Sequence, residues 1–242
     1  MKLTDYFDKT YIINLPVRKD RLWMIKHELK RAGIKLAPGK VEIFRGIRPE
    51  GPGVFPNAGV RGCFLSHLSI LKQAQKENLK NVMIMEDDLA INDFFIKNEE
   101  KIVENLRSQE WGMVYLGHIL KLRQTTSFRF EPHEGRIWTA HWYGVSRKML
   151  DPLVAFLEQW EGKSDLWRIH KSEHVDGAFS VFRQSQQGCL TLVSNPCLGW
   201  QKGSRSDIFP NKFFDKIPLI KNLVSWARIA KSLLIRKRRI GW

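Results

Sequence analysis

Three consecutive carboxylates, Glu86, Asp87 and Asp88, follow the apolar run 82–85 and precede a second apolar run, 89–91. The first run predicts a buried strand, so the carboxylates are expected at its carboxyl end, where open α/β sheets bind their ligands. Neighbouring carboxylates repel one another unless a cation or a proton lies between them. Because Mg²⁺ and Mn²⁺ bind through one or two carboxylates plus phosphate oxygens, the tripeptide favours a metal-nucleotide site. The competing interpretation is an acidic cap on a helix that begins near Asp88.

Alternating strands and helices are expected to position these carboxylates. Short apolar runs predict strands at 11–15, 41–44, 82–85, 111–117, 137–145 and 189–193. Capping residues and apolar positions spaced three or four apart predict helices at 20–32, 66–78, around 102–106, 146–160 and 175–182. The βα alternation has no internal repeat and no clear linker, so it predicts a single α/β domain.

Two long stretches lack such periodicity. Residues 46–62 are rich in Gly and Pro, and residues 121–135 are mostly polar. Long irregular segments inside compact domains are often lids or binding loops, so both are expected beside the site.

Composition restricts the class of protein. The chain has 242 residues, of which 43% are apolar, enough to build a core. Its three cysteines show neither a paired framework nor a zinc-ligand spacing, and no His is expected at a ligand interval from them, so we expect free thiols in a reducing compartment. Residues 1–10 have no apolar core of a signal peptide, and no run reaches the ~20 apolar residues that span a bilayer. We therefore expect a protein that is neither secreted nor membrane-spanning.

The net charge of +15 is concentrated toward the C-terminus, where no acidic residue follows Asp215. Eight basic residues lie in 216–242, interleaved with apolar residues and Trp, and the pattern predicts a basic amphipathic helix. Such a helix is typical of an anchor to an anionic membrane surface. The alternative is a helix docked on the domain with a solvated basic tip. No nucleic-acid motif accompanies the charge, so no nucleic-acid partner is expected.

With these segments in order, the chain resembles glycosyltransferase family 25, which includes bacterial lipooligosaccharide galactosyltransferases and collagen galactosyltransferases. The pieces that carry the resemblance follow the family's order from residue 11 to about 207: Ile12-Ile13-Asn14-Leu15 with Arg18 and Arg21, Gly62-Cys63 with Ser66-His67, Ile84-Met85-Glu86-Asp87-Asp88, Tyr143 with Val145-Ser146, Val175-Asp176, and the closing segment from Gln201 to Asp207. The Gly62-to-His67 motif followed by the acidic tripeptide is a specific combination.

The resemblance implies a GT-A type domain over 1–212, with a mixed, mainly parallel sheet. The basic tail 213–242 lies beyond the residues that the resemblance covers. It implies an inverting transfer of a hexose, most often galactose, from a UDP-sugar to an acceptor hydroxyl. The acceptor is expected to be a lipid-linked glycan such as lipopolysaccharide or lipooligosaccharide core. The expected location is cytoplasmic, peripheral on the cytoplasmic face of the inner membrane.

Matched onto this chain, the family's chemistry assigns a Mn²⁺ or Mg²⁺ ion to Glu86 and Asp88, where it would neutralise the departing diphosphate. Asp176 is the candidate base that takes the acceptor proton. Its neighbours His174 and Glu173 are rival bases, and Asp176 could instead be the N-cap of a helix at 177–182.

The remaining predicted site residues contact the donor: Asn14, Leu15, Arg18 and Arg21 at the uridine and ribose, Gly62 where the backbone approaches the ligand, Ser66 and His67 at a helix N-terminus, Asp87 beside the metal, Tyr143 at the sugar, and Gln201 as a closing residue. His67 could equally be a buried structural histidine, and Arg18 an ordinary surface residue. Cys63 is expected to pack rather than to act as a nucleophile.

Two other functions remain open from the sequence. A metal-dependent phosphoryl-transfer enzyme or nuclease could use the same carboxylates, although the chain offers no second acidic cluster of equal quality for another ion. A non-enzymatic basic module that binds anionic surfaces would leave the acidic tripeptide without a role.

Overall fold

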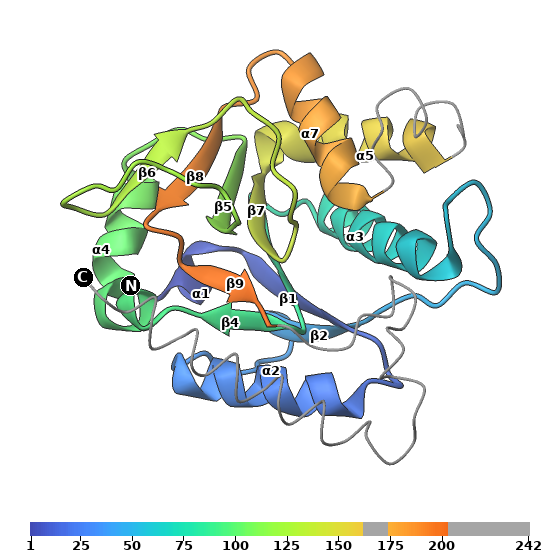
Figure 1. The fold of residues 1–242 in the computed structure, drawn as a ribbon, viewed down its shortest axis with the longest axis horizontal. Coiled ribbons are helices and arrows are strands. Elements are labelled where there is room, and N and C mark those ends of the chain that lie inside the picture. Colours follow the sequence, from blue (N-terminus) through green and yellow to red (C-terminus); the bar gives the residue numbers. More distant parts are fainter. Residues whose placement is uncertain (162–173, 203–242) are drawn as a thin grey trace.

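The computed structural model describes residues 1–161 and 174–202, which form one sheet covered by helices on both faces (Figure 1). In this described part the strands are β1 (Lys9–Asn14), β2 (Val41–Arg45), β3 (Asn81–Glu86), β4 (Leu89–Ile91), β5 (Met113–Gly117), β6 (Arg129–Pro132), β7 (Trp142–Ser146), β8 (Thr191–Asn195) and β9 (Gly199–Gln201). The helices are α1 (Leu3–Tyr6), α2 (Lys19–Arg31), α3 (Ala58–Lys76), α4 (Asp93–Arg107), α5 (Arg147–Glu161) and α7 (Val175–Ser185).

The strands pair in the order β2-β1-β3-β7-β5-β8-β6, with β9 beside β5 and β4 beside β9. The pairings make β1, β2, β3, β5, β8 and β9 run in one direction and β4, β6 and β7 in the other. The predicted α/β class with a mixed, mainly parallel sheet is therefore confirmed.

Two apolar clusters lie on the two faces of the sheet. One contains residues of α3, α5 and α7, such as Phe64 and Phe179; the other contains residues of α1, α2 and α4, such as Phe95. β3 contributes to both, because Ile84 belongs to the first cluster and its neighbours Met83 and Met85 to the second. Burial on both faces explains the unbroken apolar run of this strand.

The competing interpretation of the acidic tripeptide, a cap on a helix that begins near Asp88, is wrong. Strand β4 begins at Leu89, and the next helix, α4, begins at Asp93 with Asn92 as its N-cap, whose Oδ1 accepts a hydrogen bond from the Phe94 N–H at 2.9 Å. The short pair β4–β9 was not predicted, because each strand has only three residues and therefore carries little periodicity.

Helix α3 also begins earlier than predicted. Asn57 is its N-cap and accepts a hydrogen bond from the Val60 N–H at 2.9 Å, so the loop after β2 covers 46–57 rather than 46–62. Ser66 lies in the middle of this helix and does not cap it. The second expected loop, 121–135, contains strand β6.

The predicted tail 213–242, the residues of the closing segment after Lys202, and the rival base Glu173 lie outside the described residues. Within the described ranges, none of the helices is both long and apolar enough to cross a membrane.

Candidate active site

A cavity of about 540 Å³ lies where the carboxyl ends of β1 and β3 meet α3, the loop after β2, and the end of β9. Nine of the residues predicted for the site line it: Leu15, Arg21, Gly62, Ser66, His67, Glu86, Asp87, Asp88 and Gln201. The parallel pairing of β1 with β3, which sets Ile13 opposite Glu86, brings the first and third strand ends together. The fold therefore gathers motifs that are up to 186 positions apart, between Leu15 and Gln201, around one cavity.

Asp87 is held by two protein donors. Asn14 Nδ2 donates to its Oδ2 at 2.7 Å, and Arg21 Nη1 donates to its Oδ1 at 2.9 Å. Burial raises the pKa of Asp87, although the Arg21 charge and these hydrogen bonds oppose the rise. Because both of its carboxylate oxygens accept hydrogen bonds, Asp87 links β1 and α2 to the end of β3.

Asp88 is a carboxylate whose burial is only partly compensated. It is buried, Arg21 Nη1 lies 3.5 Å from its Oδ2, and its Oδ1 has no hydrogen-bond partner within the described part of the chain. Burial, followed by the charge of Glu86, raises the pKa of Asp88 to about 7. A divalent cation would remove this penalty, so the residues present fit a metal bound at Asp88.

Glu86 lies beside Asp88 in a different environment. Gln201 Nε2 donates to its Oε2 at 3.0 Å, and His67 Nε2 lies 3.4 Å from its Oε1. Burial acts to raise the pKa of Glu86, but the imidazoles of His67 and His141 and the Gln201 hydrogen bond together hold it below its ordinary value. Glu86 therefore stays ionised and adds its charge to the cavity.

His67 is fully buried, and Tyr143 is the partner of its ring and of its Nδ1. Its Nδ1 lies 2.9 Å from the hydroxyl of Tyr143, and the two rings stack with centroids 5.7 Å apart. Tyr143 is itself buried behind His67 and is not part of the cavity wall. It contacts His67, which lines the cavity, rather than the cavity directly.

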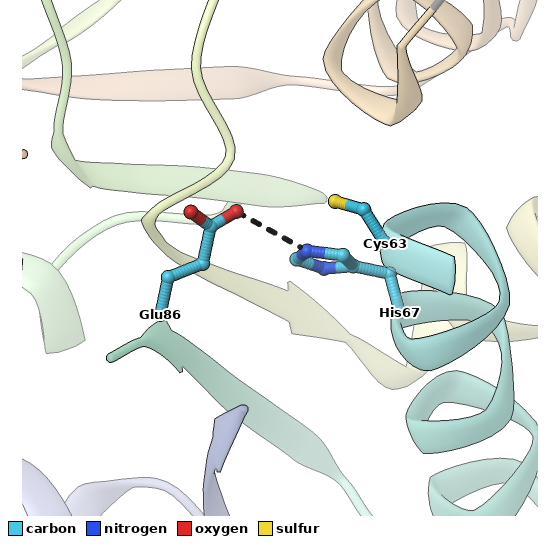
Figure 2. A group of neighbouring side chains, drawn as sticks. All are labelled: Cys63, His67 and Glu86. Carbon is cyan, nitrogen blue, oxygen red and sulfur yellow. Dashed lines mark ion pairs between the residues drawn. The ribbon is translucent and has the colours of Figure 1, made fainter. Parts of the chain in front are cut away.

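Cys63, one turn before His67 on α3, points with it toward Glu86 (Figure 2). Donor atoms of Cys63, His67 and Glu86 all lie within 4.8 Å of one another. This corrects the expectation that no His stands at a ligand interval from a Cys. The i,i+4 spacing on a helix was the available signal, and it was missed because α3 was expected to begin only at Ser66.

Gly62 and Ser66 join α3 to the loop after β2 at this wall of the cavity. A Cβ on Gly62 would lie 2.4 Å from the carbonyl oxygen of Ile47, so the close approach at this position is to the loop after β2. Ser66 Oγ donates to the Gly62 carbonyl at 2.6 Å and accepts from the Ile47 N–H at 2.8 Å. Both residues border the cavity while their contacts fix α3 against that loop.

Four predicted site residues lie off the cavity wall. Asn14 and Tyr143 contact wall residues from behind, whereas Arg18 pairs with Asp20 through two hydrogen bonds of 3.0 and 2.8 Å. Asp176 lies in the first turn of α7, which begins at Val175 with His174 as N-cap, so the alternative of Asp176 as N-cap is wrong.

Asp176 interacts electrostatically with Glu86 at the end of β3 and with His67 of α3. Its Oδ1 accepts a hydrogen bond from the N–H of Gly177 at 2.8 Å. Burial raises its pKa, with a smaller contribution from the charge of Glu86, while His174 and His67 oppose the rise. A carboxylate with a raised pKa is suited to accept a proton near neutral pH.

Two cationic residues on the cavity wall were not predicted from the sequence, Arg48 and Lys202. Lys202 donates its backbone N–H to the Asp88 carbonyl at 2.7 Å, and its Nζ pairs with Glu28 of α2 at 2.8 Å. Arg48 lies in none of the quoted motifs, and Lys202 lies in the closing segment 201–207 without an assigned role there. Their places depend on the loop after β2 and on the β4–β9 pairing.

Several known proteins match part of this chain. The mouse protein named inactive glycosyltransferase 25 family member 3 is 33% identical over 91 residues, which cover 37% of this chain and 14% of that protein. Human procollagen galactosyltransferase 2 is 27% identical over 129 residues, 46% of this chain and 21% of that protein. The Xenopus laevis procollagen galactosyltransferase 1-B is 29% identical over 136 residues, 46% of this chain and 21% of that protein. The chain thus spans about a fifth of the procollagen galactosyltransferases that it matches.

Among solved structures, a glycosyltransferase involved in the glycosylation of the major capsid of PBCV-1 overlaps 82% of this chain and 93% of its own, with a TM-score of 0.41 and 10% identity. Mannose-1-phosphate geranyltransferase from Thermus thermophilus overlaps 76% of this chain and 72% of its own, with a TM-score of 0.37 and 10% identity.

A family model matches the middle of the chain, including α3 and the acidic tripeptide. It is described as glycosyltransferase family 25 (LPS biosynthesis protein) and covers residues 57–167. The resemblance to glycosyltransferase family 25 is thereby confirmed for this chain.

Proposed function

We propose that this protein is a metal-dependent, inverting glycosyltransferase that moves a hexose from a UDP-sugar to a hydroxyl of a glycan acceptor. The observation that carries the proposal is Asp88, a buried carboxylate on the cavity wall with one oxygen unpartnered among the described residues and a pKa of about 7. The matching relatives named as galactosyltransferases make galactose the first sugar to test.

In this proposal Asp88 and Glu86 hold a Mn²⁺ or Mg²⁺ ion, since both are carboxylate residues that line the cavity. When bound, the ion would neutralise the charge that develops on the departing diphosphate. Asp87 has a positioning role. Its hydrogen bonds with Asn14 and Arg21 fix the backbone that also carries Glu86 and Asp88.

The cavity walls supply the contacts for the donor. Arg48 adds positive charge that suits a diphosphate, and Leu15 and Val17 offer apolar surface at the end of β1. We assign the acceptor proton to Asp176, an assignment supported by its raised pKa and by its electrostatic interaction with Glu86.

The acceptor and the location belong to the same proposal. The basic tail 216–242 suits an anionic membrane surface, and α2 presents further basic and aromatic groups to solvent, namely Lys19, Lys26, Lys30 and Trp23, which is 68% exposed. These features support a lipid-linked acceptor, such as lipopolysaccharide core, reached from the cytoplasmic face of the inner membrane.

The decisive experiment is calorimetric titration of the protein with UDP, GDP, CMP and ADP, each with Mn²⁺ and with EDTA. The expected result is binding of UDP alone, and only with the metal. Asp88→Asn should abolish it, while Asp151→Asn, which alters an exposed carboxylate on α5, should not. Metal-independent binding, or no nucleotide binding at all, would overturn the proposal and favour a surface-binding module.

A further inference from the structure

The wall of the cavity holds a second group of potential metal ligands whose chemistry differs from that of Asp88. Cys63 offers sulfur, His67 a ring nitrogen and Glu86 a carboxylate oxygen, and these donor atoms lie within 4.8 Å of one another (Figure 2). Cys63 and His67 project from adjacent turns of α3, and Glu86 projects from the end of β3. All three line the cavity.

The environment of His67 favours a role as a metal ligand. The residue is 0% exposed, and its Nε2 makes no hydrogen bond within the described structure, although Oε1 of Glu86 lies 3.4 Å away. The Tyr143 hydroxyl occupies the other ring nitrogen, Nδ1, at 2.9 Å. An outer partner of this kind fixes the ring and leaves Nε2 to face a cation, as is usual for metal-bound histidines.

The spacing suits a tetrahedral ion. Ligand atoms around zinc lie roughly 3.3 to 3.8 Å apart, given bonds of about 2.0 to 2.3 Å. The His67–Glu86 separation of 3.4 Å already falls in that range. The cluster as a whole has to close by about 1.5 Å at most to reach this spacing.

We propose that Cys63, His67 and Glu86 form a binding site for a thiophilic divalent cation such as Zn²⁺, separate in chemistry from the oxygen-ligand site at Asp88. Thiolate and imidazole ligands select zinc over magnesium and manganese, which prefer oxygen alone. On binding, the Cys63 thiol forms a bond from sulfur to the metal and releases its proton to solvent. The three ligands leave a fourth position open to the cavity.

Glu86 belongs to both sites, so the two ions are expected to compete. Zn²⁺ bound at Cys63 and His67 would hold Glu86 away from a Mn²⁺ ion at Asp88. Micromolar Zn²⁺ should then weaken the Mn²⁺-dependent binding of UDP. This consequence rests on the proposed function, whereas the thiophilic site itself does not.

The site can be tested with Co²⁺, whose bond to a thiolate produces a charge-transfer absorption. The full-length protein, freed of metal with EDTA and dialysed, should develop this absorption with one equivalent of Co²⁺ and lose it when Zn²⁺ is added. Cys63→Ser should abolish the absorption, and His67→Asn should weaken Co²⁺ binding by about tenfold or more. Cys189→Ser, which alters another free cysteine, should leave it intact.

Two further results keep the test decisive if Cys63→Ser misfolds. In the unaltered protein, Zn²⁺ should slow alkylation of Cys63 by about tenfold while leaving Cys189 unchanged, as measured by peptide mass spectrometry. Asp88→Asn should retain the Co²⁺ absorption even though it loses metal-dependent UDP binding. Absorption that survives Cys63→Ser, or equal alkylation of both cysteines with and without Zn²⁺, would overturn the site whatever the outcome for UDP.

Discussion

Asn14 and Asp87 lie 73 positions apart in the sequence and are joined by a buried hydrogen bond of 2.7 Å from Nδ2 to Oδ2. The bond ties the last residue of β1 to the loop that follows β3, across a parallel strand pair. Because Arg21 occupies the other oxygen of Asp87, the two flanking carboxylates, Glu86 and Asp88, are the ones left for a ligand. These two polar contacts thus divide three adjacent acids into a structural residue and two candidate metal ligands.

The contribution of Asp88 to the stability of the metal-free protein should fall as the pH rises from about 4 to 7, because Asp88 keeps in the folded state a proton that the unfolded chain loses. Its pKa is raised from 3.8 to about 7, so this loss of stability is complete once the pH exceeds the pKa of Asp88 in the folded state. Asp88→Asn cannot ionise, and it should be more stable than the unaltered protein at pH 8 by about 2 to 4 kcal/mol. Urea unfolding in EDTA at pH 5 and pH 8 measures both effects.

The control for that experiment is Asp151→Asn, which removes an exposed carboxylate paired with Arg147. It should shift stability by less than about 1 kcal/mol, as is usual for a surface ion pair. Added Mn²⁺ should stabilise the unaltered protein at pH 8 and leave Asp88→Asn unaffected, since only the former binds the ion. Equal pH profiles for the unaltered protein and Asp88→Asn would contradict the assignment.

Gly62→Ala should destabilise the fold by about 1 to 3 kcal/mol. The added Cβ would lie 2.4 Å from the Ile47 carbonyl oxygen, and that backbone is tied to Ser66 on the same helix, so the loop must shift. Gly51→Ala, in the same loop, meets nothing within 4 Å and should change stability by less than about 0.5 kcal/mol. Thermal unfolding followed by circular dichroism compares the two variants, and equal melting temperatures would exclude the close contact.

Asp176→Asn should lower sugar transfer by about 10²-fold to 10⁴-fold, which is the usual contribution of a general base. Binding of UDP with Mn²⁺ should stay within about twofold of the unaltered protein, because Asp176 does not line the cavity. Transfer assays paired with calorimetry separate the two effects. Full activity in Asp176→Asn would move the role to a rival such as His174, for which His174→Ala is the matched test.

Deletion of residues 216–242 should release the protein from anionic vesicles without abolishing hydrolysis of the sugar donor. The deletion removes eight basic residues, each of which contributes about 1 kcal/mol near an anionic surface. Co-sedimentation with vesicles that contain phosphatidylglycerol measures the change, and neutral phosphatidylcholine vesicles serve as the control. Undiminished sedimentation of the shortened protein would refute the anchor.

Several elements could be predicted because their signals are local. The apolar run of β3 and the acids behind it predicted a buried strand that ends at a polar site, and the structure bears this out. The helix starts were harder, since Asn57 caps α3 inside a stretch whose Gly and Pro content indicated a loop. Misplacing that start by eight residues hid the i,i+4 relation between Cys63 and His67.

The sequence by itself determined the α/β class, the family resemblance and the acidic tripeptide at a strand end, because burial periodicity and motif spacing are carried by neighbouring residues. Only the tertiary structure decided which acids are free to bind a ligand. Asn14, Tyr143 and Gln201 reach their partners Asp87, His67 and Glu86 across 73, 76 and 115 positions. Such contacts, and the raised pKa of Asp88, depend on which strands pair and on how deeply each group is buried, and no local pattern in the chain encodes either.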